Sequence, residues 1–100
     1  MEDKITVRLT EDVRPYMAGF IIHKQADVKT IERAFQEGNY EVVGEIAHRM
    51  QGTSAMFGIA VLADVCASLI NSVRARDARE IGGKIAELSR ILGRLDITYE

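Results

Sequence analysis

Hydrophobic residues recur every three or four positions along most of the chain, which is the spacing of amphipathic helices. We expect a first helix to be capped by Thr10, with Glu11 and Asp12 favourably placed near the positive end of the helix dipole. Gly38 should end this helix and Asn39 should cap the next one. The hydrophobic face of the first helix carries Val13, Met17, Phe20, Ile21, Val28, Ile31 and Phe35.

Two features complicate the start of the chain. Pro15 falls in the second turn of the expected first helix, where it would break or kink the helix start. Residues 1–9 alternate weakly between polar residues and the hydrophobic residues Ile5, Val7 and Leu9. Because strand signals are nearly absent elsewhere, we expect this segment to be a short extended or frayed lead-in.

The second and third helices follow with very short connections. The second is expected over residues 40–57 and ends at Gly58, because glycine suits a helix C-terminus. The third is expected over residues 61–73, with residues 74–76 as a short connector. One face of this third helix carries Leu62, Val65, Cys66, Leu69 and Val73.

A fourth helix begins after Asp77, which together with Glu80 three residues later resembles a capping box. Its hydrophobic residues follow a heptad-like spacing at Ile81, Ile85, Leu88, Leu92 and Leu95. Four amphipathic helices joined by short loops pack as antiparallel neighbours. The sequence therefore predicts an all-α fold, an up-down-up-down antiparallel four-helix bundle with a short N-terminal lead-in. Residues 1–100 are expected to form a single domain with its core at about residues 10–95.

Composition narrows the class of protein. The 100 residues are 47% hydrophobic and 28% charged, as in a single globular domain. The net charge of −2 shows no basic excess, which argues against a nucleic-acid partner. No hydrophobic run approaches the about 20 residues that a membrane span needs, and residues 1–9 do not resemble a signal peptide. The single cysteine excludes an intramolecular disulfide, and we expect a soluble cytoplasmic protein.

The second helix carries a histidine opposite its hydrophobic residues. At about 100° per residue, His48 points away from the bundle interior. Gly44 and Gly52 lie one turn before and one turn after it on the same face. Each glycine costs a helix interior about 1 kcal/mol relative to alanine, so two of them beside one exposed imidazole suggest that a partner approaches the ring closely. The opposite side of the helix carries Ile46, Met50 and Phe57.

An exposed imidazole of this kind suits few reactions. A metal site needs three or four ligands, and neither histidine nor cysteine follows His48 at the third or fourth position, so no metal is expected. Cys66 lies on a hydrophobic face and is interpreted as a core residue, and His23 lies on another helix. The sequence also has no glycine-rich phosphate loop. Direct nucleophilic attack of a ring nitrogen on phosphorus remains.

Residues 48–58, HRMQGTSAMFG, resemble the signature of histidine-containing phosphotransfer (HPt) domains. That signature has a histidine, an aliphatic residue two positions later, then Lys-Gly, small polar residues, and an apolar residue followed by glycine. The resemblance covers about residues 10–92. Further positions that fit the family lie at residues 35–40, Ala47, Leu62, Cys66 and Leu69.

The resemblance implies a phosphorelay intermediate that is not an enzyme on its own. His48 would exchange a phosphoryl group with the aspartate of a response-regulator receiver domain. The partners would be such receivers or a hybrid sensor histidine kinase, with no nucleic acid and no membrane. The receiver would supply Mg²⁺, so this chain would need no cofactor, metal or nucleotide. Gly52 would leave room for the ring and for the docked receiver.

One position departs from the family pattern. Gln51 stands where the family has lysine, and its neutral amide implies slower transfer or a less stable phosphohistidine. Arg49 or Arg74 could supply a replacement charge, the latter from the end of the third helix. The receiver is expected to dock over Gly44, Arg49, Ala55 and Met56, with Tyr16 and Phe20 as further candidates, although Phe20 suits the core better.

Two alternatives stay open. The chain could be an HPt-like docking module that binds a receiver or kinase and regulates it without phosphotransfer, which Gln51 favours. It could instead be a structural bundle that self-associates through its amphipathic helices, in which case replacing His48 would change nothing. An outward histidine between Gly44 and Gly52 favours the phosphocarrier over both alternatives.

Overall fold

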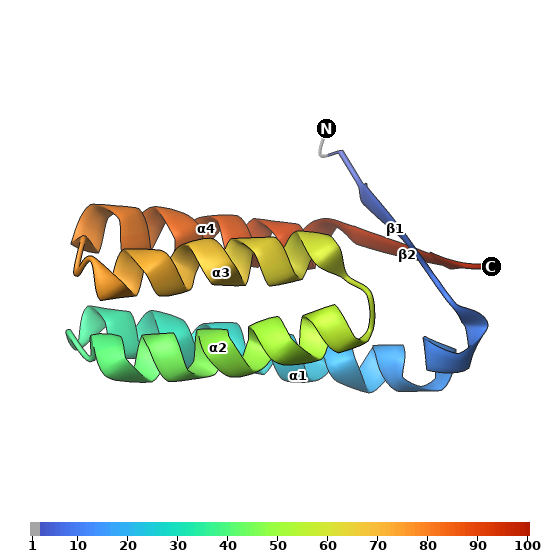
Figure 1. The fold of residues 1–100 in the computed structure, drawn as a ribbon, viewed down its shortest axis with the longest axis horizontal. Helices are drawn as coiled ribbons and strands as arrows, with labels where there is room; N and C mark the ends of the chain where they lie inside the picture. The colour runs from blue at the N-terminus through green and yellow to red at the C-terminus, as the bar shows by residue number, and fades with distance from the viewer. Residues whose placement is uncertain (1–2) are drawn as a thin grey trace.

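The computed structural model describes residues 3–100, and four helices make up most of it (Figure 1). A 3₁₀ turn precedes the first helix, and two short strands lie near the two ends of the described chain. The predicted four helices are therefore present, with two strands in addition. In chain order the elements are β1 (Ile5–Leu9), η1 (Glu11–Val13), α1 (Arg14–Gln36), α2 (Tyr40–Met56), α3 (Ala60–Arg74), α4 (Ala78–Arg94) and β2 (Leu95–Tyr99).

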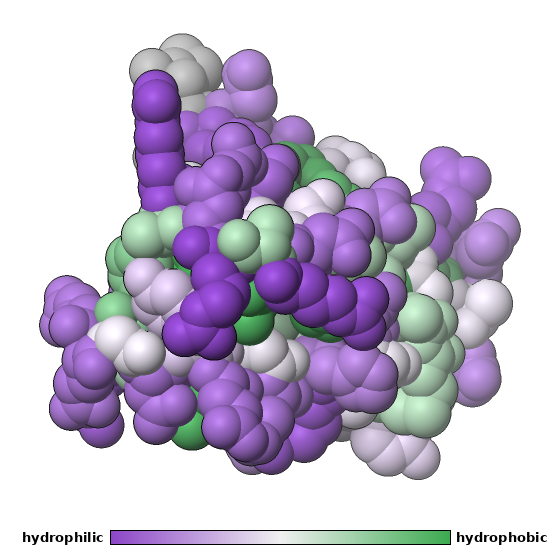
Figure 2. All heavy atoms as spheres, turned by 60° about the vertical axis from the view of Figure 1, so that its left-hand side comes forward, coloured by the Kyte–Doolittle hydropathy of each residue, from purple (hydrophilic) through white to green (hydrophobic). Residues whose placement is uncertain are grey.

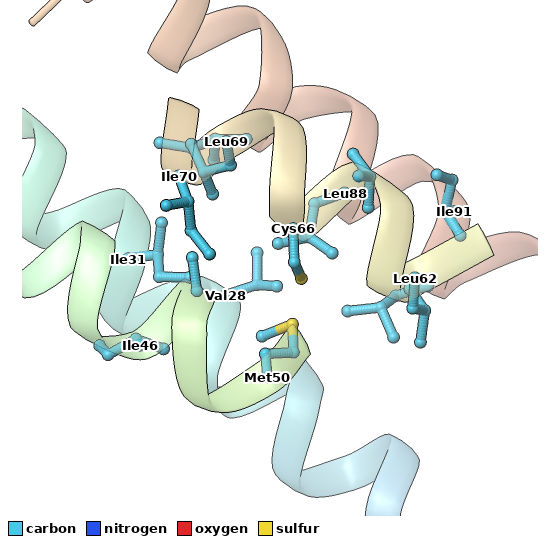
Figure 3. Packing of buried hydrophobic residues seen from close by; sticks show 14 of the residues in the cluster. Val28, Ile31, Ile46, Met50, Leu62, Cys66, Leu69, Ile70, Leu88 and Ile91 are labelled. Atoms are coloured by element: carbon cyan, nitrogen blue, oxygen red, sulfur yellow. The ribbon is translucent and has the colours of Figure 1, made fainter. Parts of the chain in front are cut away.

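The helices form a bundle in which each helix packs against two neighbours. α1 packs against α2 and α4, and α3 packs against the same two helices. The α1–α2 and α3–α4 turns lie at one end of the bundle, and the α2–α3 turn lies at the other (Figure 1). In Figure 3 the sulfur atoms of Met50 and Cys66 point toward each other from α2 and α3. The core between the helices includes the fully buried residues Ile31, Met50, Ile59, Leu62, Leu69, Ile81 and Leu88.

Hydrophilic side chains cover most of the surface on the side of the α1–α2 and α3–α4 turns (Figure 2). The exposed residues of these two turns include Glu37, Arg76 and Asp77. Within residues 3–100, none of the helices is long and apolar enough to cross a membrane.

Local sequence signals end α1 and α2, and begin α2 and α4, where they were expected. Gly38 (φ +74°) and Gly58 (φ +84°) follow α1 and α2 with positive φ angles that glycine adopts without strain. The side chain of Asn39 accepts a hydrogen bond from the N–H three residues on at 3.4 Å, and that of Asp77 does the same at 3.2 Å. These hydrogen bonds satisfy N–H groups in the first turns of α2 and α4, and they confirm the predicted starts of both helices.

The start of the first long helix differs from the prediction. Thr10 makes no capping hydrogen bond with its side chain, and the residues after it form η1 rather than an α-helix. α1 begins at Arg14, so Pro15 lies in its first turn. Backbone N–H groups in a first turn have no carbonyl partner within the helix, so the N–H that proline lacks costs α1 no hydrogen bond. Pro15 therefore opens α1 and does not break it.

The predicted lead-in covers residues 1–9, of which residues 1–2 lie outside the described part of the chain; residues 5–9 form a paired strand and are not frayed. β1 pairs in parallel with β2, from Ile5 opposite Leu95 to Leu9 opposite Tyr99. The prediction of helices alone omitted this pair, and Leu95, which was expected on the face of the fourth helix, begins β2. The segment LDITY contains β-branched and aromatic residues that favour a strand once a partner is available.

Apolar and polar contacts attach the strand pair to the bundle. Leu9 at the end of β1 is buried in the core. Arg14 at the start of α1 donates two hydrogen bonds to the Glu11 carboxylate, at 2.7 and 2.8 Å. The guanidinium carbon of Arg14 also lies 4.1 Å from the centre of the Tyr99 ring. This arginine thus links η1, α1 and β2.

Candidate functional site

His48 lies on the exposed side of α2. The core-facing side of the helix carries the buried residues Val43, Ile46, Ala47, Met50 and Ser54. Because α2 packs against α1 and α3, its exposed side lies between these two helices. The imidazole is therefore available to a second molecule without any change in the fold.

Two hollows lie in the groove between α2 and α3, and His48 lines both of them. Ile70 and Arg74 of α3 also line both, so the last residue of α3 reaches the same groove as the ring. Arg74 is therefore part of α3 and not of the connector that the sequence suggested. The larger hollow, of about 420 Å³, adds Gly44, Glu45 and Val73, and the smaller, of about 190 Å³, adds Gln51, Ala67 and Asn71.

The two glycines around His48 have different surroundings. A β-carbon added at Gly44 would lie 3.4 Å from Val73 Cγ1, so Gly44 allows α2 and α3 to pack closely. A β-carbon added at Gly52 would meet no atom within 4 Å. The space beside the ring is therefore open at Gly52, whereas at Gly44 the corresponding position is filled by Val73 of α3. The helix-geometry argument from the sequence had interpreted both glycines as space around the ring.

Arg49 leaves α2 on the side of α1, away from the hollows. Its Nη2 atom lies 4.0 Å from Asp27 Oδ1 of α1, and its side chain is 64% exposed. Gln51 is half-buried and lines the smaller hollow together with His48. Of the two arginines that the sequence offers as a replacement charge, Arg74 shares the groove with the ring and Arg49 is paired with an acid of α1.

An exposed apolar surface lies at the C-terminal end of α2. Ala55 and Met56 are exposed, and 70% of Met56 is accessible to solvent. Phe57, which follows α2, stacks on Tyr16 of α1 with ring centres 6.1 Å apart and meets Phe20 edge-on at 5.3 Å. Phe20 is buried and belongs to the core, whereas Tyr16 is exposed. Tyr16 therefore extends the apolar surface from α2 onto α1.

Other candidate nucleophiles and metal ligands are differently placed. Cys66 is buried in the core, and burial raises the pKa of its thiol to about 11. Within residues 3–100, no three His, Cys, Asp or Glu side chains are grouped as a metal site would require. His23 is exposed on α1, and its Nδ1 atom lies 4.0 Å from Asp27 Oδ2. A neutral imidazole keeps one ring nitrogen with a free electron pair, which suits attack on a phosphoryl group.

The family model of the Hpt domain matches residues 16–97 of this sequence. The chain belongs to the Hpt domain family. The matched part of this Hpt domain contains His48 and nearly all of the four helices. Hpt domains take part in histidine phosphotransfer in the phosphorelays of two-component signal transduction, where they are carriers that interact with receiver domains and kinases. No curated protein and no solved structure matches the chain.

Sequence reasoning missed several residues around the candidate site of this Hpt domain. Ile70 and Asn71 line the hollows beside the histidine, and their spacing was a usable signal, since each lies three or four residues before Arg74 on α3. Lys24 interrupts the hydrophobic face of α1, is buried, and lies 3.7 Å from Asp27. Asp27 itself carried no signal, because its link to α2 depends on how the helices pack.

Proposed function

We propose that this Hpt domain is a histidine phosphocarrier in a two-component phosphorelay, in which His48 exchanges a phosphoryl group with the aspartate of a response-regulator receiver domain. The observation that carries the proposal is an exposed histidine at the groove between α2 and α3, in a chain of the Hpt family. The proposed partners are receiver domains, free or within a hybrid sensor histidine kinase.

In the proposed exchange, one nitrogen atom of this chain reacts. The unprotonated ring nitrogen of His48 attacks the phosphorus of the receiver's aspartyl phosphate. A P–N bond forms, the P–O bond to the carboxyl group breaks, and the aspartate leaves with the electron pair as a carboxylate. The reverse reaction returns the phosphoryl group to a receiver. Mg²⁺ on the receiver would neutralise charge on the phosphoryl group, so the carrier needs neither a nucleotide nor catalysis of its own.

Three residues around the ring are proposed to support the phosphoryl group. Arg74 supplies a positive charge from α3, and Gln51 supplies amide N–H donors from α2. Gly52 leaves the approach to the ring open. Because Gln51 is neutral and charge-assisted hydrogen bonds are roughly twice as strong as neutral ones, the stronger contacts fall to arginine side chains.

The receiver is proposed to dock over the exposed side of α2. Ala55 and Met56 offer an apolar centre, which Tyr16 extends onto α1. Arg49 places a positive charge on the α1 side, and Gly44 lines the groove on the α3 side. A small apolar centre with a polar rim suits a short-lived complex that separates after each transfer.

Transfer from a phosphorylated receiver tests the proposal. The chain is incubated with several phosphorylated, Mg²⁺-loaded receiver domains, and acid-labile phosphate on the chain is measured. His48→Gln is the test variant. His23→Gln is the matched control, because His23 is the second of the two histidines and is also exposed. We expect label on the native chain and on His23→Gln, and none on His48→Gln.

Each other outcome overturns the proposal in a different way. Receiver binding without label would indicate a docking module that regulates its partner without phosphotransfer. Label that persists in His48→Gln would place the acceptor at another residue. Neither label nor binding with any receiver would leave a helical bundle with a structural role.

A further inference from the structure

Asp27 lies at the centre of a charged cluster between α1 and α2. Its side chain is 14% exposed and has three basic neighbours. Arg49 Nη2 of α2 lies 4.0 Å from its Oδ1 atom, while Lys24 Nζ and His23 Nδ1 of α1 lie 3.7 and 4.0 Å from its Oδ2 atom. One carboxylate thus lies near three basic groups, and one of them, Arg49, directly follows His48 in the sequence.

The pair between Asp27 and Arg49 is weak by its geometry. A separation of 4.0 Å is longer than the about 2.7–3.2 Å of an N–H···O hydrogen bond. The arginine side chain is also largely exposed, and exposed ion pairs contribute little to stability. Arg49 can therefore leave Asp27 at small cost.

Asp27 keeps a partner when Arg49 leaves. Lys24 is buried, and its ammonium group lies between the carboxylate at 3.7 Å and the Phe20 ring, whose centre is 5.3 Å away. Asp27 Oδ2 is itself buried and makes no hydrogen bond within the described part of the chain. The carboxylate can therefore move toward the ammonium group and gain a contact as it loses the arginine.

A phosphoryl group on His48 would attract the released guanidinium of Arg49. Adjacent residues leave a helix about 100° apart, so the long, exposed side chain of Arg49 can reach the ring of His48 by curling back around α2. Gln51 carries no charge, and Arg74 approaches the ring from the α3 side alone. A phosphoryl group brings about −2 charge, which attracts a mobile guanidinium from the α1 side.

We propose that Asp27 is a positioning residue that holds Arg49 on the α1 side while His48 is unmodified and releases it to the phosphoryl group when His48 is phosphorylated. This inference rests on the proposed function, and it assigns to that site an exchange of ion pairs. Arg49 passes from Asp27 to phosphohistidine, and Asp27 closes on Lys24.

The exchange sets the lifetime of the phosphohistidine. A cation beside the phosphoryl group stabilises its negative charge, and it opposes protonation of the ring, the step that makes the P–N bond labile. Asp27 competes with the phosphoryl group for this cation. Removing the charge of Asp27 should therefore lengthen the lifetime, and removing Arg49 should shorten it.

The lifetime can be measured without any partner. The full chain is loaded with phosphoramidate, the excess is removed, and the loss of phosphohistidine is followed by ³¹P NMR. We expect Asp27→Asn to slow hydrolysis by about two- to fivefold, the range that one exposed ion pair supplies. Asp27→Glu keeps the charge and should behave as the native chain does. Arg90→Gln, which removes an exposed arginine of α4, should have no effect.

Two further variants separate the release of Arg49 from any structural damage that Asp27→Asn causes. The double variant Lys24→Met/Asp27→Asn removes the buried ammonium together with its counter-charge, so it should keep the longer lifetime without an uncompensated charge in the core. In an Arg49→Gln background, Asp27→Asn should no longer change the lifetime, because the cation that it frees is absent. Urea unfolding of each variant reports its stability independently.

The outcomes distinguish the inference from the function on which it rests. If His48 accepts phosphate normally but Asp27→Asn leaves the lifetime unchanged, or changes it equally in the Arg49→Gln background, Asp27 does not position Arg49. If no phosphohistidine forms at His48 with phosphoramidate or with any receiver, the carrier function fails and the inference fails with it. A lifetime that lengthens only when Arg49 is present supports both.

Discussion

Gly44 of α2 and Val73 of α3 face each other so closely that a β-carbon at position 44 would lie 3.4 Å from Val73 Cγ1. This contact draws the two helices together beside His48, at the larger of the two hollows that they share. Gly52 lies on the other side of the ring and has no atom within 4 Å of its β-carbon position. The two glycines of the histidine helix thus differ in what a methyl group would meet.

Replacing each glycine by alanine tests this difference. Alanine favours a helix interior over glycine by about 1 kcal/mol. We expect Gly52→Ala to raise the free energy of unfolding by about that amount, because its methyl group enters open space. Gly44→Ala should gain less, because Val73 must give way. Urea unfolding measures both changes, and an equal gain for the two variants would contradict this account of the α2–α3 packing.

Restoring a positive charge at position 51 should strengthen the phosphoryl site. Gln51→Lys replaces a neutral donor by an ammonium group in the smaller hollow beside His48. We expect faster transfer from a phosphorylated receiver and a longer-lived phosphohistidine. Gln25→Lys is the matched control, since it makes the same charge change in the groove between α1 and α4. If both lysines act alike, the effect comes from net charge and not from a contact at the ring.

The apolar end of α2 should contribute to receiver binding. Met56→Ala removes apolar area that the receiver would cover, and we expect a loss of about 1 kcal/mol, roughly a fivefold rise in Kd. Ile22→Ala is the control, because Ile22 is 68% exposed, much as Met56 is. It lies about 200° around α1 from Phe20, which contacts Phe57 at the end of α2, so Ile22 faces away from the proposed docking surface. Titration calorimetry with a receiver compares the two. An equal loss for Ile22→Ala would remove the case for docking over α2.

Stability should fall in alkaline solution through Cys66. Burial raises the pKa of its thiol from the ordinary value of 9.0 to about 11, so the unfolded chain releases this proton at lower pH than the folded chain does. The stability that the buried thiol contributes is therefore complete below pH 9.0 and is lost as the pH rises toward about 11. Urea unfolding across this range should show a steeper fall for the native chain than for Cys66→Ala. Parallel curves would mean that other groups govern the alkaline loss.

Most of the helical fold could be predicted because its signals are local. Asn39 and Asp77 cap the helices that follow them, and Gly38 and Gly58 adopt the positive φ angles expected after α1 and α2. The outward direction of His48 follows from helix periodicity in the same way. Each of these features depends on residues within one or two turns.

The features that sequence reasoning missed depend on contacts between distant segments. Residues 5–9 show a weak strand pattern, but the partner strand begins at Leu95, which also continues the hydrophobic spacing of the fourth helix. Gly44 fits open space or close packing equally well until α3 is placed against it. The pair between Arg49 and Asp27 likewise requires the relative position of α1 and α2.

The parallel pairing of β1 with β2 also determines how the domain responds to a pulling force. Ile5 is opposite Leu95 and Leu9 is opposite Tyr99. The N-terminal end of β1 and the C-terminal end of β2 therefore lie at opposite ends of the strand pair. Tension applied at these two ends shears the strands along each other, so their hydrogen bonds share the load and do not open one after another. The strand pair thus acts as a mechanical clamp that must rupture before the force reaches the helices and the histidine they carry.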